Sequence, residues 1–383
     1  MDKWLNKIIP KVLAGDKILQ NNFFISLFLC AIPASISIGI TVYSYSLFLS
    51  TYPSTWIPYW LLGEGITILL IGNILSIYNP GNYKLYVQIL LISISVIIFA
   101  MLLLSHLPWY WTPFVVVLIL RACSSISGVI FWGIVSTLFY HRQFKNIFNR
   151  FTISASVASL LSPLFYAWIS HIFNLSSILA FLIILLIAGY FAINFTVKIV
   201  NDPGEPLNKY QQSTSPFQLP LFRILLAVML VINIVFTGIE FLMRSHLEMH
   251  FNKEQIATFI SLFLLITNIL SLGSQLIAPK IFSRFKFYII LQGIFIIVIL
   301  GNILYWFIPS LWHAVFLNAI TLIFYYGWIN LIHSSVSNIF PPVIKIKSDL
   351  FLTSFTSPLG VILAAILAVF SIRFTTILNF LPL

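Results

Sequence analysis

The chain has 383 residues, of which 60% are hydrophobic and 8% charged, with a formal net charge of +11 and a mean hydropathy of +1.04. Because a soluble domain carries about 25% charged residues, this composition excludes a water-soluble domain and predicts a polytopic membrane protein. The positive charge does not indicate nucleic-acid binding, because the basic residues lie in short intervals between apolar segments, where they set orientation.

The N-terminal segment, residues 1–20, is basic and partly amphipathic. It is expected on the cytoplasmic side, either as a helix on the membrane surface or as a disordered tail. No cleavable signal peptide is evident, because no small-residue cleavage site follows a short apolar core. Cys30 and Cys123 both fall inside apolar segments. They are interpreted as small packing residues and not as a disulfide framework.

A membrane-spanning helix needs roughly 20 apolar residues. Eleven segments of the sequence meet this requirement: 23–49, 56–78, 84–105, 111–139, 151–172, 175–199, 219–243, 256–279, 287–307, 311–339 and 349–371. The remaining residues, 372–383, contain Arg373 and are too short to cross a bilayer. A twelfth helix is therefore expected to be short or absent.

The distribution of basic residues predicts the orientation. If the N-terminus is cytoplasmic, 16 of the 20 lysines and arginines fall on the cytoplasmic side, and the exceptions are Arg121, Arg244, Lys253 and Arg373. This bias is the pattern expected of an integral membrane protein with a cytoplasmic N-terminus. The isoleucine-, asparagine-, phenylalanine- and lysine-rich composition favours a bacterial inner membrane.

A polar interval at 200–218 follows the sixth span and divides the chain. It separates a six-helix bundle, 21–199, from a C-terminal bundle, 219–383. The two halves show a weak internal similarity, because Trp132 precedes Ser162-Pro163 at nearly the same interval as Trp328 precedes Ser357-Pro358. Two parallel repeats joined by a cytoplasmic linker are typical of major facilitator transporters. The predicted fold class is therefore an all-α, major-facilitator-like membrane protein.

Three stretches of the sequence resemble the bacterial and plastid ATP/ADP translocases, a branch with this architecture. They are Glu240-Phe-Leu-Met-Arg244 followed by Ala257, Phe259 and Phe263; Phe131-Trp132 followed by Gln143, Lys145, Phe148 and Ser154; and Ile339-Phe-Pro-Pro-Val-Ile-Lys-Ile-Lys347. Together they touch about a third of the chain, in the family's order and spacing. The resemblance implies transport of a nucleotide-like solute, with Glu240 and Arg244 in the positions of a glutamate and a lysine of the family.

The chain also departs from that family at its charged positions. Residues 23–49 contain no charge where the family has a lysine, Arg121 lies beside the position of a family glutamate, and Asp349 stands near the position of another lysine. A cavity for a polyphosphate needs several cations, because desolvated phosphates must be compensated. The sequence therefore offers fewer cations than nucleotide exchange requires.

Glu64 and Arg121 are the two clearly intramembrane charges. Both lie about 12–15 Å from the outer ends of their spans at 1.5 Å per residue, so they are able to pair. Intramembrane ionisable residues indicate function by default. Arg121 is predicted to bind an anionic group, and Glu64 to balance it or carry a proton. The alternative is a structural ion pair within the N-terminal bundle.

Glu240 and Arg244 lie four residues apart, on one helical face near the outer surface. They form either an ordinary surface pair or a site that touches substrate or gates transport. Asp349 is a further candidate for coupling. Ser125, within the small-residue run 121–128, is a candidate pore-lining residue, although helix contact also favours small residues.

His246 and His250, with Glu248 between them, share a helical face but lack the spacing and the third ligand of a zinc site. No metal and no cofactor is predicted. The sequence contains no pairing of a nucleophile with a base, no phosphate loop and no ATPase domain, so the protein is not predicted to be an enzyme.

The leading hypothesis is a secondary active transporter of a small organic anion or nucleotide-like solute. It would work by alternating access, in which one half rocks against the other. The alternative is a non-transporting scaffold or sensor built on a degenerate transporter fold, which the lost cations favour. The expected partners are the solute and the lipid bilayer, and the oligomeric state stays open.

Overall fold

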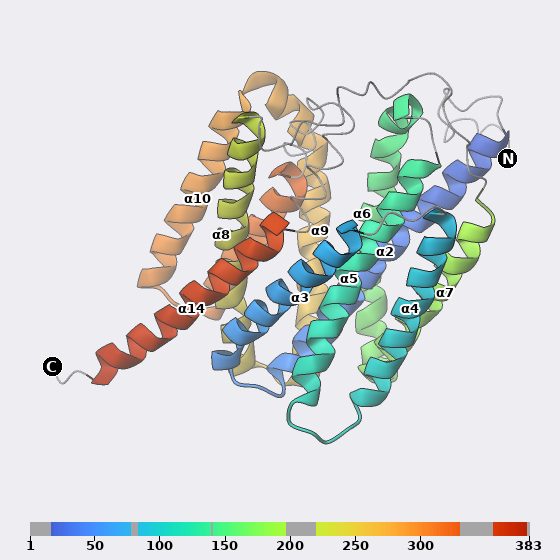
Figure 1. Cartoon of the computed structure of the whole chain (residues 1–383). Coiled ribbons are helices and arrows are strands. Elements are labelled where there is room, and N and C mark those ends of the chain that lie inside the picture. The colour runs from blue at the N-terminus through green and yellow to red at the C-terminus, as the bar shows by residue number, and fades with distance from the viewer. Residues whose placement is uncertain (1–16, 78–82, 139–140, 197–219, 330–354, 381–383) are drawn as a thin grey trace. The chain divides into compact units, whose positions relative to one another are not determined.

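The computed structural model describes residues 17–77, 83–138, 141–196, 220–329 and 355–380, and their regular structure is entirely helical (Figure 1). Helices are expected here, because each backbone polar group must find its partner within its own segment in a bilayer. In these ranges nine helices are long and apolar enough to cross a membrane, and Thr112–Gly128 and Ser357–Phe370 are shorter apolar stretches. The chain is an integral membrane protein with multiple spans.

Within the described residues each of the eleven predicted spans overlaps an α-helix, as expected of an all-α membrane protein. The helices are α2 (Lys17–Leu49), α3 (Ile57–Ile77), α4 (Tyr83–Leu104), α5 (Thr112–Thr137), α6 (His141–Ile172), α7 (Ser176–Asn194), α8 (Pro220–His250), α9 (Lys253–Arg284), α10 (Phe287–Phe307), α11 (Leu311–Phe324) and α14 (Ser357–Phe380). A 3-10 turn, η2 (Ser54–Trp56), precedes α3, and a π-helical turn, η5 (Tyr325–Ile329), follows α11.

Several helices extend beyond their apolar cores. The predicted spans leave residues 244–255 outside the membrane helices, but α8 continues to His250 and only Phe251 and Asn252 separate it from α9. Asn252 starts α9 in a capping box, because its side chain accepts from the Gln255 backbone and Gln255 accepts from the Asn252 backbone. Residues 372–380, which were expected to lie beyond the eleventh span, form the end of α14.

Contacts between helices group the chain into two compact units. The first comprises Met1–Ser44 and Asn79–Pro206, and the second comprises Tyr45–Tyr78 and Leu207–Leu383. The boundary therefore falls inside α2, and α3 is grouped with the later helices because it packs on α14 and α8. The two bundles expected from the sequence, 21–199 and 219–383, stay a prediction.

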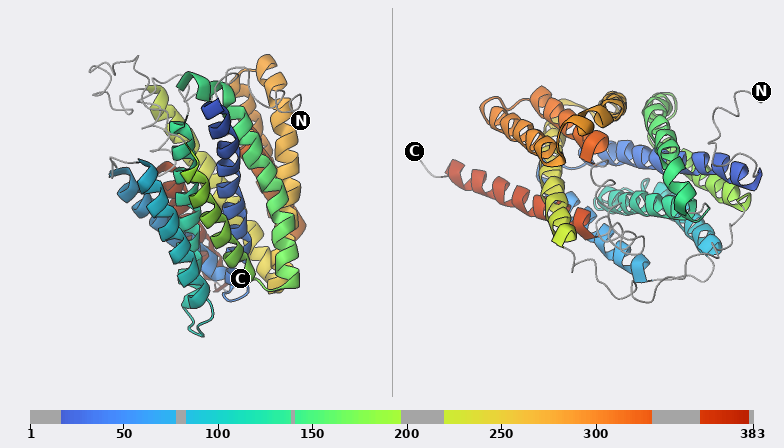
Figure 2. Two further views of the ribbon diagram at one scale, coloured as in Figure 1. Left: turned by 90° about the vertical axis from the view of Figure 1, so that its right-hand side faces the viewer. Right: turned by 90° about the horizontal axis from the view of Figure 1, so that it is seen from above.

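In the first unit, α4 lies beside α7 and α5, and α6 packs on α7 (Figures 1 and 2). Polar side chains join the helices at their ends and along their lengths. Gln88 of α4 donates to Asn194 of α7 at 2.6 Å. The Ser154 hydroxyl of α6 donates to the Leu27 carbonyl of α2 at 2.7 Å. Such bonds between helices partly replace the hydrophobic driving force that the bilayer does not supply.

In the second unit, α14 lies along α3 and α8 (Figure 1). The helix α11 packs on α8, α9 and α10. Gly65 permits the close approach of α3 to α14, because a Cβ there would come within 2.7 Å of Ile362 and 3.0 Å of the Pro358 carbonyl. Ile239, Ile290, Ile294, Val298 and Leu317 form a buried cluster between α8, α10 and α11. Close packing of small and branched residues is typical of membrane helix interfaces.

Candidate functional site

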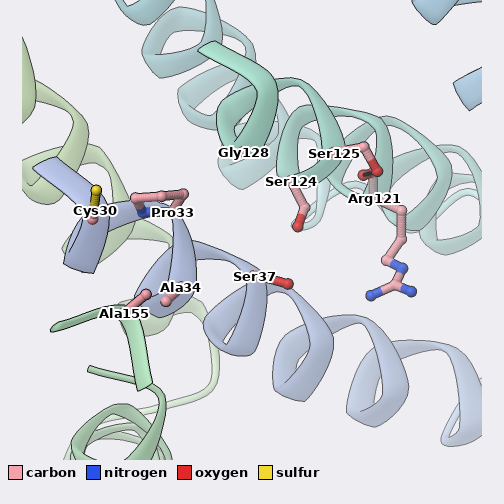
Figure 3. Close-up of a pocket in the computed structure, with 9 residues that line it drawn as sticks. All are labelled: Cys30, Pro33, Ala34, Ser37, Arg121, Ser124, Ser125, Gly128 and Ala155. Carbon is pink, nitrogen blue, oxygen red and sulfur yellow. Dashed lines mark hydrogen bonds between the residues drawn. The ribbon is translucent and has the colours of Figure 1, made fainter. Parts of the chain in front are cut away.

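The first unit contains a cavity of about 320 Å³ between α2 and α5, with one lining residue from α6 (Figure 3). Its lining consists of one arginine and small residues: Cys30, Pro33, Ala34, Ser37, Arg121, Ser124, Ser125, Gly128 and Ala155. Figure 3 shows the Arg121 side chain extending from α5 toward α2, with Ser124 directed toward the same space. Two of the predicted site residues, Arg121 and Ser125, thus lie at one cavity.

The Arg121 guanidinium is held by a hydroxyl of α2. Its Nη1 donates to the Thr41 Oγ1 at 2.9 Å, and the Thr41 hydroxyl in turn donates to the Ser37 carbonyl at 2.7 Å. Because the single hydroxyl proton of Thr41 is used on the carbonyl, its lone pairs are oriented to accept from Arg121. Arg121 is half-buried. A half-buried guanidinium in a membrane-spanning helix is well suited to bind an anionic group.

The α2 wall of the cavity is shaped around Pro33, which interrupts the helical hydrogen-bond ladder. Beside it, the Ser162 hydroxyl of α6 donates to the Ser35 hydroxyl at 2.7 Å, and the Tyr166 hydroxyl donates to the Ser35 carbonyl at 2.9 Å. These bonds attach α6 to the proline-containing turn.

The second unit contains a buried charge cluster around Arg244, which is 0% exposed. Its Nη2 donates to the Glu240 Oε1 at 2.6 Å, and the Tyr45 hydroxyl donates to the same oxygen. The guanidinium carbon lies 4.3 Å from the Tyr45 ring centroid and 4.1 Å from that of Trp60. Two rings and one carboxylate thus compensate a charge that no water reaches.

Glu64 lies in the same unit, is 6% exposed, and interacts electrostatically with Arg244. The structure therefore brings together Glu64, Glu240 and Arg244, three of the predicted site residues, with Tyr45 and Trp60. Glu240 and Arg244 do not form an exposed surface pair, because the Glu240 side chain is only 17% exposed and the Arg244 side chain is fully buried. The reason is that α3 and the end of α2 cover this face of α8.

A polar stripe along α8 extends this cluster in both directions. Asn233, Thr237, Glu240, Arg244 and Glu248 recur at intervals of three or four residues, which places them on one helical face. At its two ends, the Ser357 hydroxyl of α14 donates to Asn233 at 3.2 Å and the Ser54 backbone donates to Glu248 at 3.3 Å. The stripe is thus the face that α8 turns toward the end of α2, α3 and α14.

The histidines of α8 bond to protein groups. The His246 Nε2 lies 2.7 Å from the Tyr305 hydroxyl, and the His250 Nδ1 lies 2.8 Å from the His246 carbonyl. In the described ranges no group of three histidine, cysteine, aspartate or glutamate side chains is arranged to hold a metal ion. Asp349, the remaining predicted site residue, lies outside the described residues.

Sequence reasoning missed Thr41, Tyr45 and Trp60. For the first two a signal was present, because the run from Thr41 to Ser46 places five hydroxyl-bearing residues in an otherwise apolar segment. Trp60 carries no such signal, since tryptophan is common at membrane interfaces. Its contact with Arg244 becomes visible only when α3 is packed on α8.

Comparisons with known proteins identify the fold. No family model matches the chain, and no curated protein matches it. Several solved structures do match the chain. A bacterial homologue of the iron transporter ferroportin matches with a TM-score of 0.64 and 12% identity over 92% of each chain. A D-xylose–proton symporter matches with a TM-score of 0.64 and 12% identity over 91% of this chain and 89% of that one.

The nucleoside transporter NupG matches with a TM-score of 0.59 and 16% identity over 92% of this chain and 90% of that one. At these identities the matches show the fold alone. The chain therefore has a major-facilitator-like fold, which it shares with these transporters.

Proposed function

We propose that the protein is a secondary active transporter of a small organic anion, with Arg121 as the anion contact. The observation that carries this proposal is the guanidinium held at the cavity of the first unit by Thr41. A guanidinium binds carboxylates and phosphates with two parallel hydrogen bonds. Ser37, Ser124 and Ser125 add hydroxyls around it, so a ligand would meet both charge and hydrogen-bonding groups.

The resemblance to ATP/ADP translocases extends this proposal to nucleotide-like solutes. It rests on the Glu240–Arg244 pair and the two other matching stretches. The cluster at Arg244 supports a different role for these residues, because the guanidinium is buried against Tyr45, Trp60 and Glu240. In our proposal this cluster serves gating or coupling.

Glu64 is the proposed coupling carboxylate, since it is buried in α3 near the charge of Arg244. The variant Glu64→Gln keeps the shape of the side chain and removes its charge. We expect it to abolish accumulation of solute against its gradient and to retain exchange of labelled for unlabelled solute across the membrane. Equal loss of accumulation and exchange would assign Glu64 to folding or to substrate binding.

The test of the proposed function is uptake into proteoliposomes of a labelled panel of nucleotides, organic acids and amino acids. Wild type is compared with Arg121→Ala and with Arg223→Ala, which removes an exposed arginine of α8. We expect saturable uptake of an organic anion that is lost in Arg121→Ala and kept in Arg223→Ala. Absence of all uptake by folded, inserted protein would instead favour the scaffold or sensor.

We also propose a cytoplasmic N-terminus, from the distribution of basic residues, and a bacterial inner membrane, from the composition. Cysteines introduced singly at Lys280 and at Trp109 into a cysteine-free variant provide the test. A membrane-impermeant thiol reagent added to intact cells should label Trp109→Cys and leave Lys280→Cys unlabelled. The reverse result would invert the orientation.

A further inference from the structure

We propose that Tyr166 is a positioning residue for the anion site, because it holds the turn of α2 whose Thr41 in turn holds the Arg121 guanidinium. Tyr166 has this role only if Arg121 is the anion contact, so the inference rests on the proposed function. It extends the site to a tyrosine of α6, a helix that contributes only Ala155 to the described cavity wall.

Helix α6 runs along α2 in a fixed register. The Ser154 hydroxyl donates to the Leu27 carbonyl at 2.7 Å, and the Ser162 hydroxyl donates to the Ser35 hydroxyl at 2.7 Å. In both pairs the two residues are 127 apart in sequence. The two helices are therefore parallel, and α6 contacts α2 at two levels that are about two helical turns apart.

These two levels lie on either side of Pro33. Proline has no backbone N–H, so Pro33 cannot donate to the carbonyl of Leu29, four residues earlier in α2. Prolines are the usual sites at which a helix bends, because the helix's own hydrogen bonds constrain it least there. The bonds from α6 to Leu27 and Ser35 bridge this point. The direction of α2 beyond the proline is therefore set in part by α6.

Tyr166 makes two contacts with α2 just beyond the proline. Its buried hydroxyl donates to the Ser35 carbonyl at 2.9 Å. Its ring lies against the α2 backbone one turn later, where a Cβ on Gly39 would come within 2.8 Å of the ring. Tyr166 thus fixes the turn from Ser35 to Gly39 by a hydrogen bond at one end and by packing at the other.

The same turn carries a group that holds Arg121. The Ser37 carbonyl, within the turn, accepts from the Thr41 hydroxyl at 2.7 Å, and the Thr41 Oγ1 accepts from the Arg121 Nη1 at 2.9 Å. Figure 3 shows Arg121 extending from α5 toward the part of α2 that bears Ser37. A shift of the turn that Tyr166 holds would move the Thr41 oxygen relative to α5. Tyr166 therefore acts on Arg121 through α2.

The test is Tyr166→Phe with a readout on Arg121 that needs no substrate. The variant keeps the ring and removes only the hydroxyl that bonds to α2. We expect phenylglyoxal to modify Arg121 about fivefold faster in the purified variant than in wild type, because the net contribution of one hydrogen bond corresponds to about this factor. Peptide mass spectrometry measures the rate, with the exposed Arg223 as internal reference. An unchanged ratio of the two rates would overturn the inference.

A second background separates positioning from a general loosening of the first unit. In Thr41→Val the guanidinium no longer bonds to α2, so adding Tyr166→Phe should leave the rate at Arg121 unchanged. An equal increase in both backgrounds would show general loosening and would overturn the inference. Tyr190→Phe, which removes a tyrosine hydroxyl from α7, is the matched control and should leave the rate at its wild-type value.

Ser162→Ala provides the test if Tyr166→Phe does not fold, because it removes the neighbouring bond from α6 to Ser35. We expect it to raise the rate at Arg121 in the same direction, and an unchanged rate in the folded variant would overturn the inference.

The uptake test and the modification test fail separately. Absence of uptake of every solute by folded wild type would refute the role of Arg121 as the anion contact, while the modification rates still decide whether Tyr166 positions its side chain. Uptake that is lost in Arg121→Ala, together with equal modification rates in wild type and Tyr166→Phe, would support transport and overturn the positioning role.

Discussion

Removing the charge of Glu240 should destabilise the protein, because the buried Arg244 guanidinium would then lack its counter-ion. Arg244 is 0% exposed and its Nη2 bonds to Glu240 at 2.6 Å, while its Nε and Nη1 have no hydrogen-bond acceptor among the described residues. Glu240→Gln retains an oxygen that can accept from Tyr45 and Arg244, so the variant tests the ion pair more than the shape of the site.

The magnitude follows from the burial of the two partners. Breaking a buried ion pair by removing one partner costs about 3–5 kcal/mol, because an uncompensated charge stays behind. The rings of Tyr45 and Trp60 and the nearby Glu64 still act on the guanidinium, and cation–π contacts are worth about 0.5–2 kcal/mol each. We therefore expect Glu240→Gln to cost about 3 kcal/mol, at the lower end of that range.

A double-mutant cycle with Arg244→Met separates the ion pair from the packing. Arg244→Met removes the buried cation, so adding Glu240→Gln to it should cost about 2 kcal/mol less than adding the same change to wild type. Reversible chemical unfolding in detergent micelles, followed by circular dichroism, provides the four free energies. Effects of the two changes that add within about 0.5 kcal/mol would show that the pair is not coupled, and would refute the reasoning.

Two further predictions concern single side chains. Thr41→Val removes the oxygen that accepts from Arg121. We expect the affinity for the transported anion, measured by equilibrium binding, to fall about tenfold, or 1.4 kcal/mol. An unchanged affinity would show that Thr41 does not position the guanidinium. Gly327→Ala places a Cβ 3.2 Å from the Ser274 Cβ and against its hydroxyl; we expect a loss of about 1–3 kcal/mol in unfolding free energy. Gly273→Ala, where a Cβ meets nothing within 4 Å, is the matched control, and equal effects of the two changes would contradict this account.

The fold was predictable because the bilayer imposes a simple rule on sequence. Apolar segments of about 20 residues must form helices, and each of the eleven predicted spans overlaps a helix within the described residues. The ends of the helices were less predictable. The predicted spans leave out the basic residues before Phe151 and the charged residues after Met243, which lie in α6 and α8, because hydropathy marks only the part of a helix that lies in lipid. Capping by Asn252, which starts α9 two residues after α8 ends, depends on local hydrogen bonds that hydropathy does not measure.

The sequence predicted the charged residues of the candidate site but not the uncharged residues that contact them. Intramembrane charge alone identified Arg121 and Glu64, and helical spacing joined Glu240 to Arg244. The partners that define their surroundings are uncharged and distant in sequence: Thr41 lies 80 residues from Arg121, and Tyr45 lies 195 residues from Glu240. Such pairs arise from helix packing, which no local pattern in a single sequence reveals. Asp349 stays a prediction, since it lies outside the described residues.

The spacing of Glu240 and Arg244 also bears on how the chain is made. A charged side chain in a spanning segment is costly to insert, and the distant partners of Arg244, Tyr45 and Trp60, belong to helices that precede α8 in the chain. Glu240 lies one turn before Arg244 on the same helix and bonds to it directly, so α8 brings its counter-ion with it. The ion pair can therefore form within α8 as the helix enters the bilayer, and Tyr45 and Trp60 can pack on the guanidinium afterwards.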